Sequence, residues 1–101
     1  MSKVKHIGFV KFKEGTSEDQ INDLFAQLLD LSESVEGIED YVSGPNTSPE
    51  GLNQGLTHCF IATFASDKDR DDYLVHPDHK EFGKILGPHL DKVTVVDFWV
   101  N

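Results

Sequence analysis

The segment KVKHIGFVKF, residues 3–12, constrains the fold more than any other part of the chain, because it is typical of a strand with two apolar faces. One face would carry Val4, His6, Gly8, Val10 and Phe12, and the other Lys5, Ile7, Phe9 and Lys11. Segments 56–65 and 91–101 show the same two-sided pattern. A sheet with one face in water should alternate cleanly between apolar and polar residues. Both faces of this sheet are therefore expected to be covered.

A long amphipathic helix is predicted over residues 16–37. Its apolar residues recur at helical spacing and form one stripe: Ile21, Leu24, Phe25, Leu28, Leu31 and Val35. A capping box of Ser17 with Gln20 is predicted at its start. Thr16 with Asp19 has the same spacing and competes for this role. Such a helix can cover one face of the sheet.

The remaining segments alternate between strand and helix. Residues 38–44 are typical of a short, polar edge strand, and residues 45–55 form a loop with two prolines and two glycines. A short acidic helix is capped by Ser66 and ends near His76-Pro77. Another helical turn or two follows at residues 79–87, before the last strand.

The order of these elements is β-α-β-β-α-β, which is typical of a ferredoxin-like α+β domain with an antiparallel sheet. The helices can cover only one face of that sheet. A second copy of the chain is the simplest cover for the other face, with two sheets closing into a barrel across a two-fold axis. We therefore expect one domain over residues 1–101 that forms a homodimer, a dimeric α+β barrel.

The charge balance excludes several classes of partner. The 101 residues include 18 acidic and 9 basic side chains, a formal net charge of −9. Because Lys and Arg must neutralise phosphates, no nucleic acid is expected as a partner, and binding to an anionic membrane is disfavoured too. No apolar run approaches a membrane span, and the N-terminal segment alternates with charge, unlike a signal peptide. The single cysteine, Cys59, forms no internal disulfide, so a cytoplasmic location is expected.

Three segments resemble the stress-responsive A/B barrel domain family: VKHIGFVKFKEG, THCFIATF and YLVHPDHKEFG. The resemblance extends over about residues 3–98 and is most specific in the Tyr-x-x-His-Pro-x-His segment. It implies a ferredoxin-like monomer whose sheet packs against that of a partner. The strands with two apolar faces predict the same dimer independently of this resemblance.

The resemblance also implies a candidate site inside the monomer. A plant polyketide cyclase branch of the family uses a tyrosine and a histidine as an acid/base pair for an aldol ring closure. These two residues match Tyr73 and His79, and two further histidines of that branch match His6 and His58. The implied activity is that of a cyclase or lyase acting on a small carbonyl ligand.

Two positions depart from that branch. Leu28 stands where the branch has a tyrosine on the first helix, and Gly8 stands where it has a larger aliphatic residue. Both positions shape the implied pocket, so they are candidate ligand-binding residues. For the same reason the polyketide substrate is not carried over.

Each candidate residue also has a structural interpretation. His6 and His58 would then be core histidines, each held by one hydrogen bond. Tyr73 would pack its ring on the sheet, and His79 would cap or pack against the bend at Pro77. In the enzymatic interpretation, His79 acts as the base and Tyr73 donates a hydrogen bond to a developing oxyanion.

No metal and no other cofactor is expected. His76 and His79 are three residues apart, but Pro77 between them disfavours a continuous helix, and no zinc motif accompanies them. The acidic run at residues 67–71 lacks the glycine and glutamate that a calcium loop requires, so it is interpreted as an acidic first helical turn. Cys59 is predicted to be a buried, inert thiol.

Two functions of different class remain open. The first is a small-ligand protein with cyclase-like or lyase-like activity, and the second is a non-catalytic, stress-associated structural domain. A ligand site should be hollow and lined by the three histidines and Tyr73. In a structural domain, aromatic side chains should fill that space instead. The candidates are Phe9, Phe60, Phe64 and Trp99.

Overall fold

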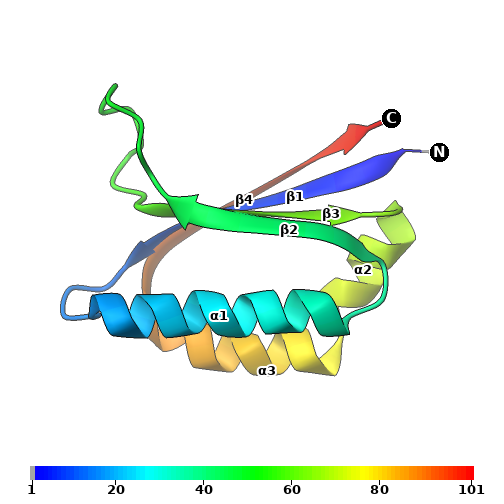
Figure 1. The fold of residues 1–101 in the computed structure, drawn as a ribbon, viewed down its shortest axis with the longest axis horizontal. Coiled ribbons are helices and arrows are strands. Elements are labelled where there is room, and N and C mark those ends of the chain that lie inside the picture. The colour runs from blue at the N-terminus through cyan, green and yellow to red at the C-terminus, as the bar shows by residue number, and fades with distance from the viewer. Residues whose placement is uncertain (1) are drawn as a thin grey trace.

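A four-stranded antiparallel sheet forms the centre of the fold in this computed structural model, which describes residues 2–101 (Figure 1). The strands are β1 (Lys3–Phe12), β2 (Ile38–Pro45), β3 (His58–Phe64) and β4 (Leu90–Val100). They lie in the order β2-β3-β1-β4, with every neighbouring pair antiparallel. This confirms the predicted ferredoxin-like α+β architecture, and β2 is an edge strand as expected.

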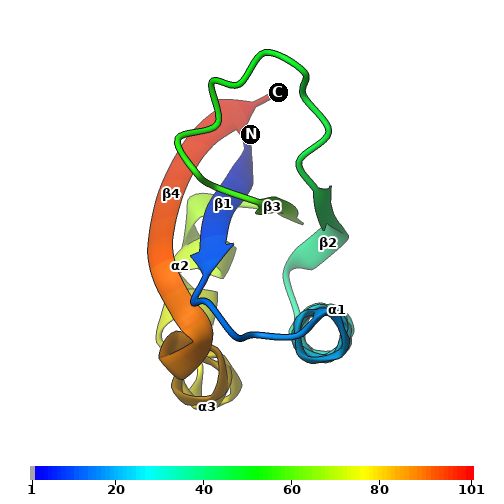
Figure 2. The ribbon, with the colours of Figure 1, turned by 90° about the vertical axis from the view of Figure 1, so that its left-hand side faces the viewer.

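Three helices cover one face of the sheet. They are α1 (Glu18–Ser34), α2 (Asp67–Leu74) and α3 (Pro77–Leu86), and a 3-10 turn, Gly87–His89, leads into β4. Helices α1 and α3 run beside each other on the same side of the sheet (Figure 2). The face of the sheet that meets the helices is called the inner face below.

Local side-chain contacts begin each helix. Ser17 Oγ accepts from the Gln20 backbone N–H at 3.1 Å, and the Gln20 side chain accepts from the Ser17 N–H at 2.9 Å. This is the predicted capping box at Ser17. Helix α3 begins earlier than predicted, because the ring of His76 accepts from the Asp78 N–H at 3.0 Å and Pro77 fits the first helical position.

The core lies between the sheet and the helices. One buried cluster comprises Val4, Leu28, Leu31, Val35, Ala62, Phe64, Tyr73 and Phe82. A second comprises Val10, Phe12, Ile21 and Leu24. The predicted apolar stripe of α1 therefore faces the sheet. Most of the hydrophobic stabilisation of the monomer comes from this layer.

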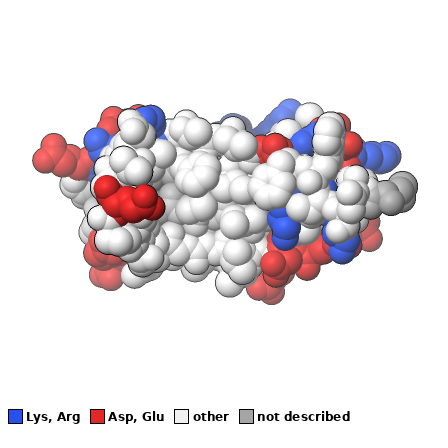
Figure 3. Space-filling view, turned by 90° about the horizontal axis from the view of Figure 1, so that it is seen from above, with Lys and Arg blue, Asp and Glu red and all other residues white. Residues whose placement is uncertain are grey.

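The opposite face of the sheet, called the outer face below, is also apolar. Ile7 of β1 lies in register with Ile61 and Val96, and Val42 and Phe98 lie on the same face. Figure 3 shows a broad area over the middle of this face without Lys, Arg, Asp or Glu. Val96 and Phe98 are each 49% exposed, so within residues 2–101 nothing covers them fully. No helix in this described part of the chain is long and apolar enough to cross a membrane.

Candidate functional site

His6 lies in the middle of β1 on the inner face, where it is only 7% exposed. Its partners in register are Ala62 of β3 and Asp97 of β4. The Nδ1 atom of His6 is 2.8 Å from an Asp97 carboxylate oxygen. Because an ionised carboxylate only accepts hydrogen bonds, Nδ1 donates to Asp97, and Nε2 is the ring nitrogen not used in this contact.

Asp97 links His6 to Arg70. Its second carboxylate oxygen accepts from Arg70 Nη1 at 2.8 Å, and Arg70 Nε donates to Asp71 at 2.9 Å. The side chains of Arg70 and Asp97 are 21% and 23% exposed, so this pair is partly shielded from solvent. The pair holds the carboxylate, and through it the imidazole of His6, in one orientation. Sequence analysis missed both residues, because only the β1–β4 register places Asp97 opposite His6.

The side chains of Tyr73 and His79 are in contact at the junction between α2 and α3. Their ring centroids are 4.4 Å apart at an interplanar angle of 56°. Tyr73 is 5% exposed, and its ring is also 6.4 Å from that of His6. Burial raises the pKa of Tyr73 to about 12, and the neighbouring Tyr41 adds to this effect. The Tyr73 hydroxyl therefore stays protonated at neutral pH and is a hydrogen-bond donor.

His79 carries a buried polar atom without a partner. Its Nδ1 atom forms no hydrogen bond of good geometry within residues 2–101, although the backbone of Leu74 lies near the ring. Burial lowers the pKa of His79, the nearby Leu74 backbone opposes this effect, and the proximity of His6 and His76 lowers the pKa further. The ring is therefore neutral at pH 7 and can accept a proton. His6, Tyr73 and His79 together are called the inner cluster below.

His58 shares the inner face but lies apart from the inner cluster. It is four residues along β3 from Ala62, about 13 Å at the usual rise of a strand. Its ring stacks on Phe25 at 5.4 Å and meets Phe12 edge-on at 5.5 Å. The Thr57 hydroxyl lies 2.9 Å from its Nδ1. These contacts correspond to the structural interpretation of a packed histidine.

Gly8 and Leu28 do not line an open pocket in this structure. A Cβ atom at Gly8 would collide with the ring of Phe60, which occupies the space above the glycine. The Phe60 ring also lies 6.1 Å from the ring of His6, and Phe64 lies 6.0 Å from it. Leu28 lines an apolar cavity of about 10 Å³ beside Phe60, large enough for about one water molecule. Aromatic side chains therefore fill most of the space beside His6.

Tyr41 is a further polar residue on the inner face that sequence analysis missed. It lies in register with Ala62, and its ring stacks against Phe60 at 6.4 Å. Its hydroxyl is buried and forms no hydrogen bond of good geometry within residues 2–101. Burial raises the pKa of Tyr41, and the nearby Ser43 side chain opposes this in part. It lies in an otherwise polar edge strand, so the sequence gave no indication that its side chain is on the inner face.

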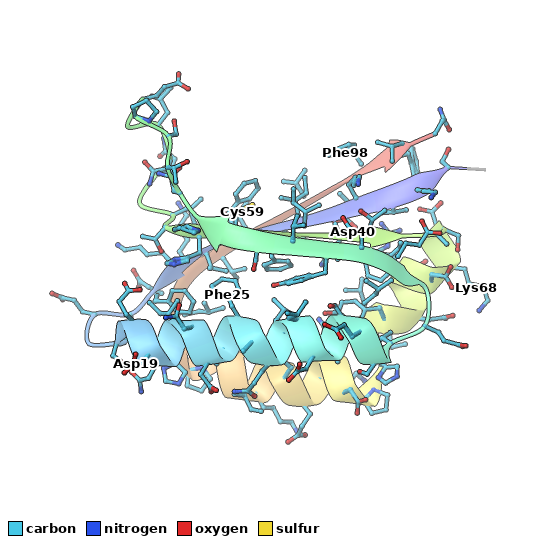
Figure 4. The ribbon with its side chains drawn as sticks, in the orientation of Figure 1. Asp19, Phe25, Asp40, Cys59, Lys68 and Phe98 are labelled. Carbon is cyan, nitrogen blue, oxygen red and sulfur yellow. The ribbon has the colours of Figure 1, made fainter. Side chains whose placement is uncertain are left out.

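Other residues singled out in the sequence have local structural roles. No group of three or more His, Cys, Asp or Glu side chains suited to a metal occurs within residues 2–101. The run at 67–71 lies in α2, where Ser66 caps the helix by accepting from the Asp69 N–H at 3.2 Å. Cys59 points to the outer face, as does Phe98, whereas Phe25 lies between α1 and the sheet (Figure 4).

The sequence profile of the stress responsive A/B barrel domain family matches residues 4–100. The chain belongs to this family. It is similar to the stress-response A/B barrel domain-containing protein HS1 of Arabidopsis thaliana, with 38% identity over 95 residues that span 94% of this chain and 87% of that protein. It is also similar to olivetolic acid cyclase of Cannabis sativa, with 28% identity over 94% of each chain.

Solved structures of family members and of related folds agree with this assignment. A hydroxynitrile lyase from Passiflora edulis superposes with a TM-score of 0.91 at 28% identity, covering 98% of this chain and 94% of that chain. A dimeric ferredoxin-like protein of unknown function from Jannaschia sp. CCS1 superposes with a TM-score of 0.85 at 26% identity, covering 97% and 99%. The proteins similar to this chain therefore include one named for catalysis and one named for stress response.

Proposed function

We propose that this chain binds a small organic carbonyl compound at the inner cluster and that Tyr73 and His79 act on it as an acid/base pair. Two similar proteins support an enzymatic role by their names, one a cyclase and one a hydroxynitrile lyase. Both names denote reactions at carbon atoms that carry oxygen functions. The proposal applies this class of chemistry to the present chain, but it does not assign the substrate of either relative to it.

The single observation that carries the proposal is the unpaired Nδ1 of His79 beside Tyr73. A buried nitrogen without a hydrogen bond costs about 1–3 kcal/mol. Native structures keep few such groups, and a catalytic role is one of the explanations for those that persist. Here the unpaired atom belongs to a ring that lies 4.4 Å from a buried phenol, centroid to centroid. A bound ligand would give the His79 nitrogen the partner that the free protein lacks.

The roles follow from the charge states. His79 is neutral at pH 7, so it can remove a proton from a carbon next to a carbonyl group. Tyr73 keeps its proton and can donate a hydrogen bond to the oxygen on which negative charge develops. His6, oriented by Asp97, offers Nε2 to a ligand hydroxyl group. The imidazole of His79 and the hydroxyl donor of Tyr73 suffice for proton transfer at an enolisable ligand.

We also propose that the outer face is covered by a second copy of the chain. The uncharged middle of that face and its half-exposed apolar residues support this assembly. A neighbour of the same fold is described as dimeric. Sheet-to-sheet packing of this kind would remove Ile7, Val96 and Phe98 from water.

A second candidate function is a non-catalytic, stress-associated structural domain. It is favoured by the packing of Phe60 over Gly8 and by an interior cavity of only about 10 Å³. In that case the histidines only pack. The proposed ligand site instead requires Phe60 to move aside when a ligand enters.

Two assays separate the candidates. One follows ring closure of a linear polyketide analogue, and the other follows aldehyde release from a hydroxynitrile. Wild-type protein should accelerate at least one reaction, and Tyr73→Phe and His79→Gln should each reduce that rate at least tenfold. His89→Gln, outside the inner cluster, is the matched control and should keep the rate. Equal rates in the wild type and in both cluster variants would favour the structural domain.

A further inference from the structure

His76 connects α2 to α3 through three hydrogen bonds. Its backbone N–H donates to the Tyr73 carbonyl oxygen at 3.0 Å, and its carbonyl oxygen accepts from the Lys80 N–H at 3.1 Å. Its ring nitrogen Nδ1 accepts from the Asp78 N–H at 3.0 Å. The first two contacts are made by the backbone, so most other residues could form them. The third requires a side chain that accepts a hydrogen bond, so it depends on the identity of residue 76.

The contact through Nδ1 satisfies an N–H group that has no partner inside the helix. The first N–H groups of a helix lack carbonyl acceptors one turn earlier. Pro77 has no N–H, so Asp78 is the first residue of α3 whose N–H needs an acceptor. Asn, Asp, Ser and Thr are the side chains that usually provide it. Histidine differs from these four, because it takes up a proton near neutral pH.

Protonation of His76 and capping by its ring exclude one another. Both nitrogens of an imidazolium ring carry a proton, so neither accepts a hydrogen bond. The side chain of His76 is 37% exposed, so solvent can protonate it. Its Nδ1 lies 3.9 Å from a carboxylate oxygen of Asp78, which would accept a hydrogen bond from the charged ring. The ring would then turn from the backbone of Asp78 to its side chain, and the Asp78 N–H would lose its acceptor.

Few other charges act on His76. Asp72, near the end of α2, pairs with Lys68 instead. Within residues 2–101 no carboxylate of α1 or of the sheet forms an ion pair with the His76 ring. The remaining titratable neighbour is His79, and a charge on either ring disfavours a charge on the other. The charge state of His76 therefore depends on the pH of the solvent, on Asp78 and on His79.

We infer that His76 is a positioning residue that holds His79 beside Tyr73 only while its own ring is neutral. The cap stabilises the first turn of α3, and His79 lies in that turn. Loss of the cap would loosen this turn and with it the 4.4 Å contact between the rings of Tyr73 and His79. Acid would therefore weaken the proposed acid/base pair through His76 as well as through His79 itself. The catalytic part of this inference rests on the function proposed above, but the loosening of the turn is measured without a substrate.

The Lys80 amide reports on the opening of the first turn of α3, because its hydrogen bond to the His76 carbonyl oxygen must break before it exchanges with solvent. Its hydrogen exchange is measured in the full chain at pH 7.5 and pH 5.5, and each rate is corrected for the intrinsic effect of pH. Protection in the wild type should fall about fivefold at pH 5.5, the usual effect of losing a helix cap. His76→Asn, whose amide oxygen caps without taking up a proton, should show equal protection at both pH values. His76→Ala should show the reduced protection at both.

His89→Asn is the matched control, since His89 lies in the 3-10 turn that follows α3. It removes a titrating ring but should show the same loss of Lys80 protection in acid as the wild type. NMR contacts between the ring protons of Tyr73 and His79 should weaken at pH 5.5 in the wild type and persist in His76→Asn. Equal Lys80 protection at both pH values in the wild type, or the same loss in His76→Asn, would overturn the inference.

The outcomes separate this inference from the proposed function. With the role of His76 correct, the ratio of kcat/KM at pH 7.5 to kcat/KM at pH 5.5 should be smaller in His76→Asn than in the wild type. If a carbonyl compound is converted but this ratio is the same in both proteins, the role of His76 is wrong and the proposed function stands. If the turn loosens in acid as expected but no carbonyl compound is converted, the effect of His76 on the turn stands and the proposed function fails.

Discussion

The rings of Tyr73 and His79 lie 4.4 Å apart although one belongs to α2 and the other to α3. The bend at His76-Pro77 produces this contact, because it turns α3 back so that its first turn reaches the last turn of α2. His76 stabilises the bend by capping α3 with its own ring. The Tyr-x-x-His-Pro-x-His segment therefore both forms a corner and places a phenol beside an imidazole.

His79 should make the stability of the protein depend on pH. Its pKa is lowered on folding, so below about pH 6.5 the unfolded chain takes up a proton that the folded chain does not. The free energy of unfolding of the wild type should therefore fall between pH 7.5 and pH 5.5 by more than that of His79→Gln. The difference should stay below about 1 kcal/mol, because solvent screens a partly exposed ring. Urea unfolding at both pH values measures it, and a larger fall in the variant would contradict this prediction.

Gly8→Ala should destabilise the protein by about 1–3 kcal/mol, because the new methyl group collides with the ring of Phe60. Gly44→Ala is the matched control, since Gly44 also lies in a strand but has open space around it. The double variant Gly8→Ala with Phe60→Leu should lose less than the sum of the two single changes. Additive losses in urea unfolding would show that the two side chains do not compete for the same space.

Asp97→Asn should release the ring of His6. The change removes the charge that holds both His6 Nδ1 and Arg70, and it should cost about 1–3 kcal/mol in the free energy of unfolding. The ¹⁵N shifts of His6 should indicate a proton on Nδ1 in the wild type and a mixture of tautomers in the variant. Asp71→Asn, which removes only an exposed contact to Arg70, should leave the His6 shifts unchanged. An unaltered His6 tautomer in Asp97→Asn would contradict the proposed orienting role.

Ile7→Asp should convert the protein to monomers. Ile7 lies in the middle of the outer face between Ile61 and Val96, where a second copy would bury a charge. Sedimentation should give a dimer mass for the wild type and a monomer mass for the variant. Ile85→Asp on α3, 42% exposed, is the control and should remain dimeric. A monomer mass for the wild type in dilute buffer would contradict the homodimer.

The fold could be predicted from the sequence because its signals are local. The alternation in β1, the apolar stripe of α1 and the Ser17 capping box each specify an element without knowledge of the others. The first turn of α3 was placed too late, because a histidine ring serving as a helix cap has little signal in sequence.

The candidate site depends on relationships across strands, and these were harder to predict. His6 and His58 lie on the same face of the sheet. They are far apart on it, because His58 is four residues along β3 from the residue that pairs with His6. The pairing of His6 with Asp97 requires the β1–β4 register, in which one residue of slippage would turn Asp97 to the other face. The filling of the space above Gly8 by Phe60 depends on a rotamer, and composition gives no information about it.

The most direct test of the account is an NMR pH titration of the five histidines in the wild type and in Tyr73→Phe. The account predicts that His79 titrates below the ordinary value of about 6.5, because burial disfavours its charged form. It also predicts that this midpoint shifts in Tyr73→Phe, because the polar phenol beside the imidazole is replaced by an apolar ring. A His79 midpoint at or above 6.5 that does not respond to the loss of the Tyr73 hydroxyl would contradict the central claim that these two residues form a poised acid/base pair.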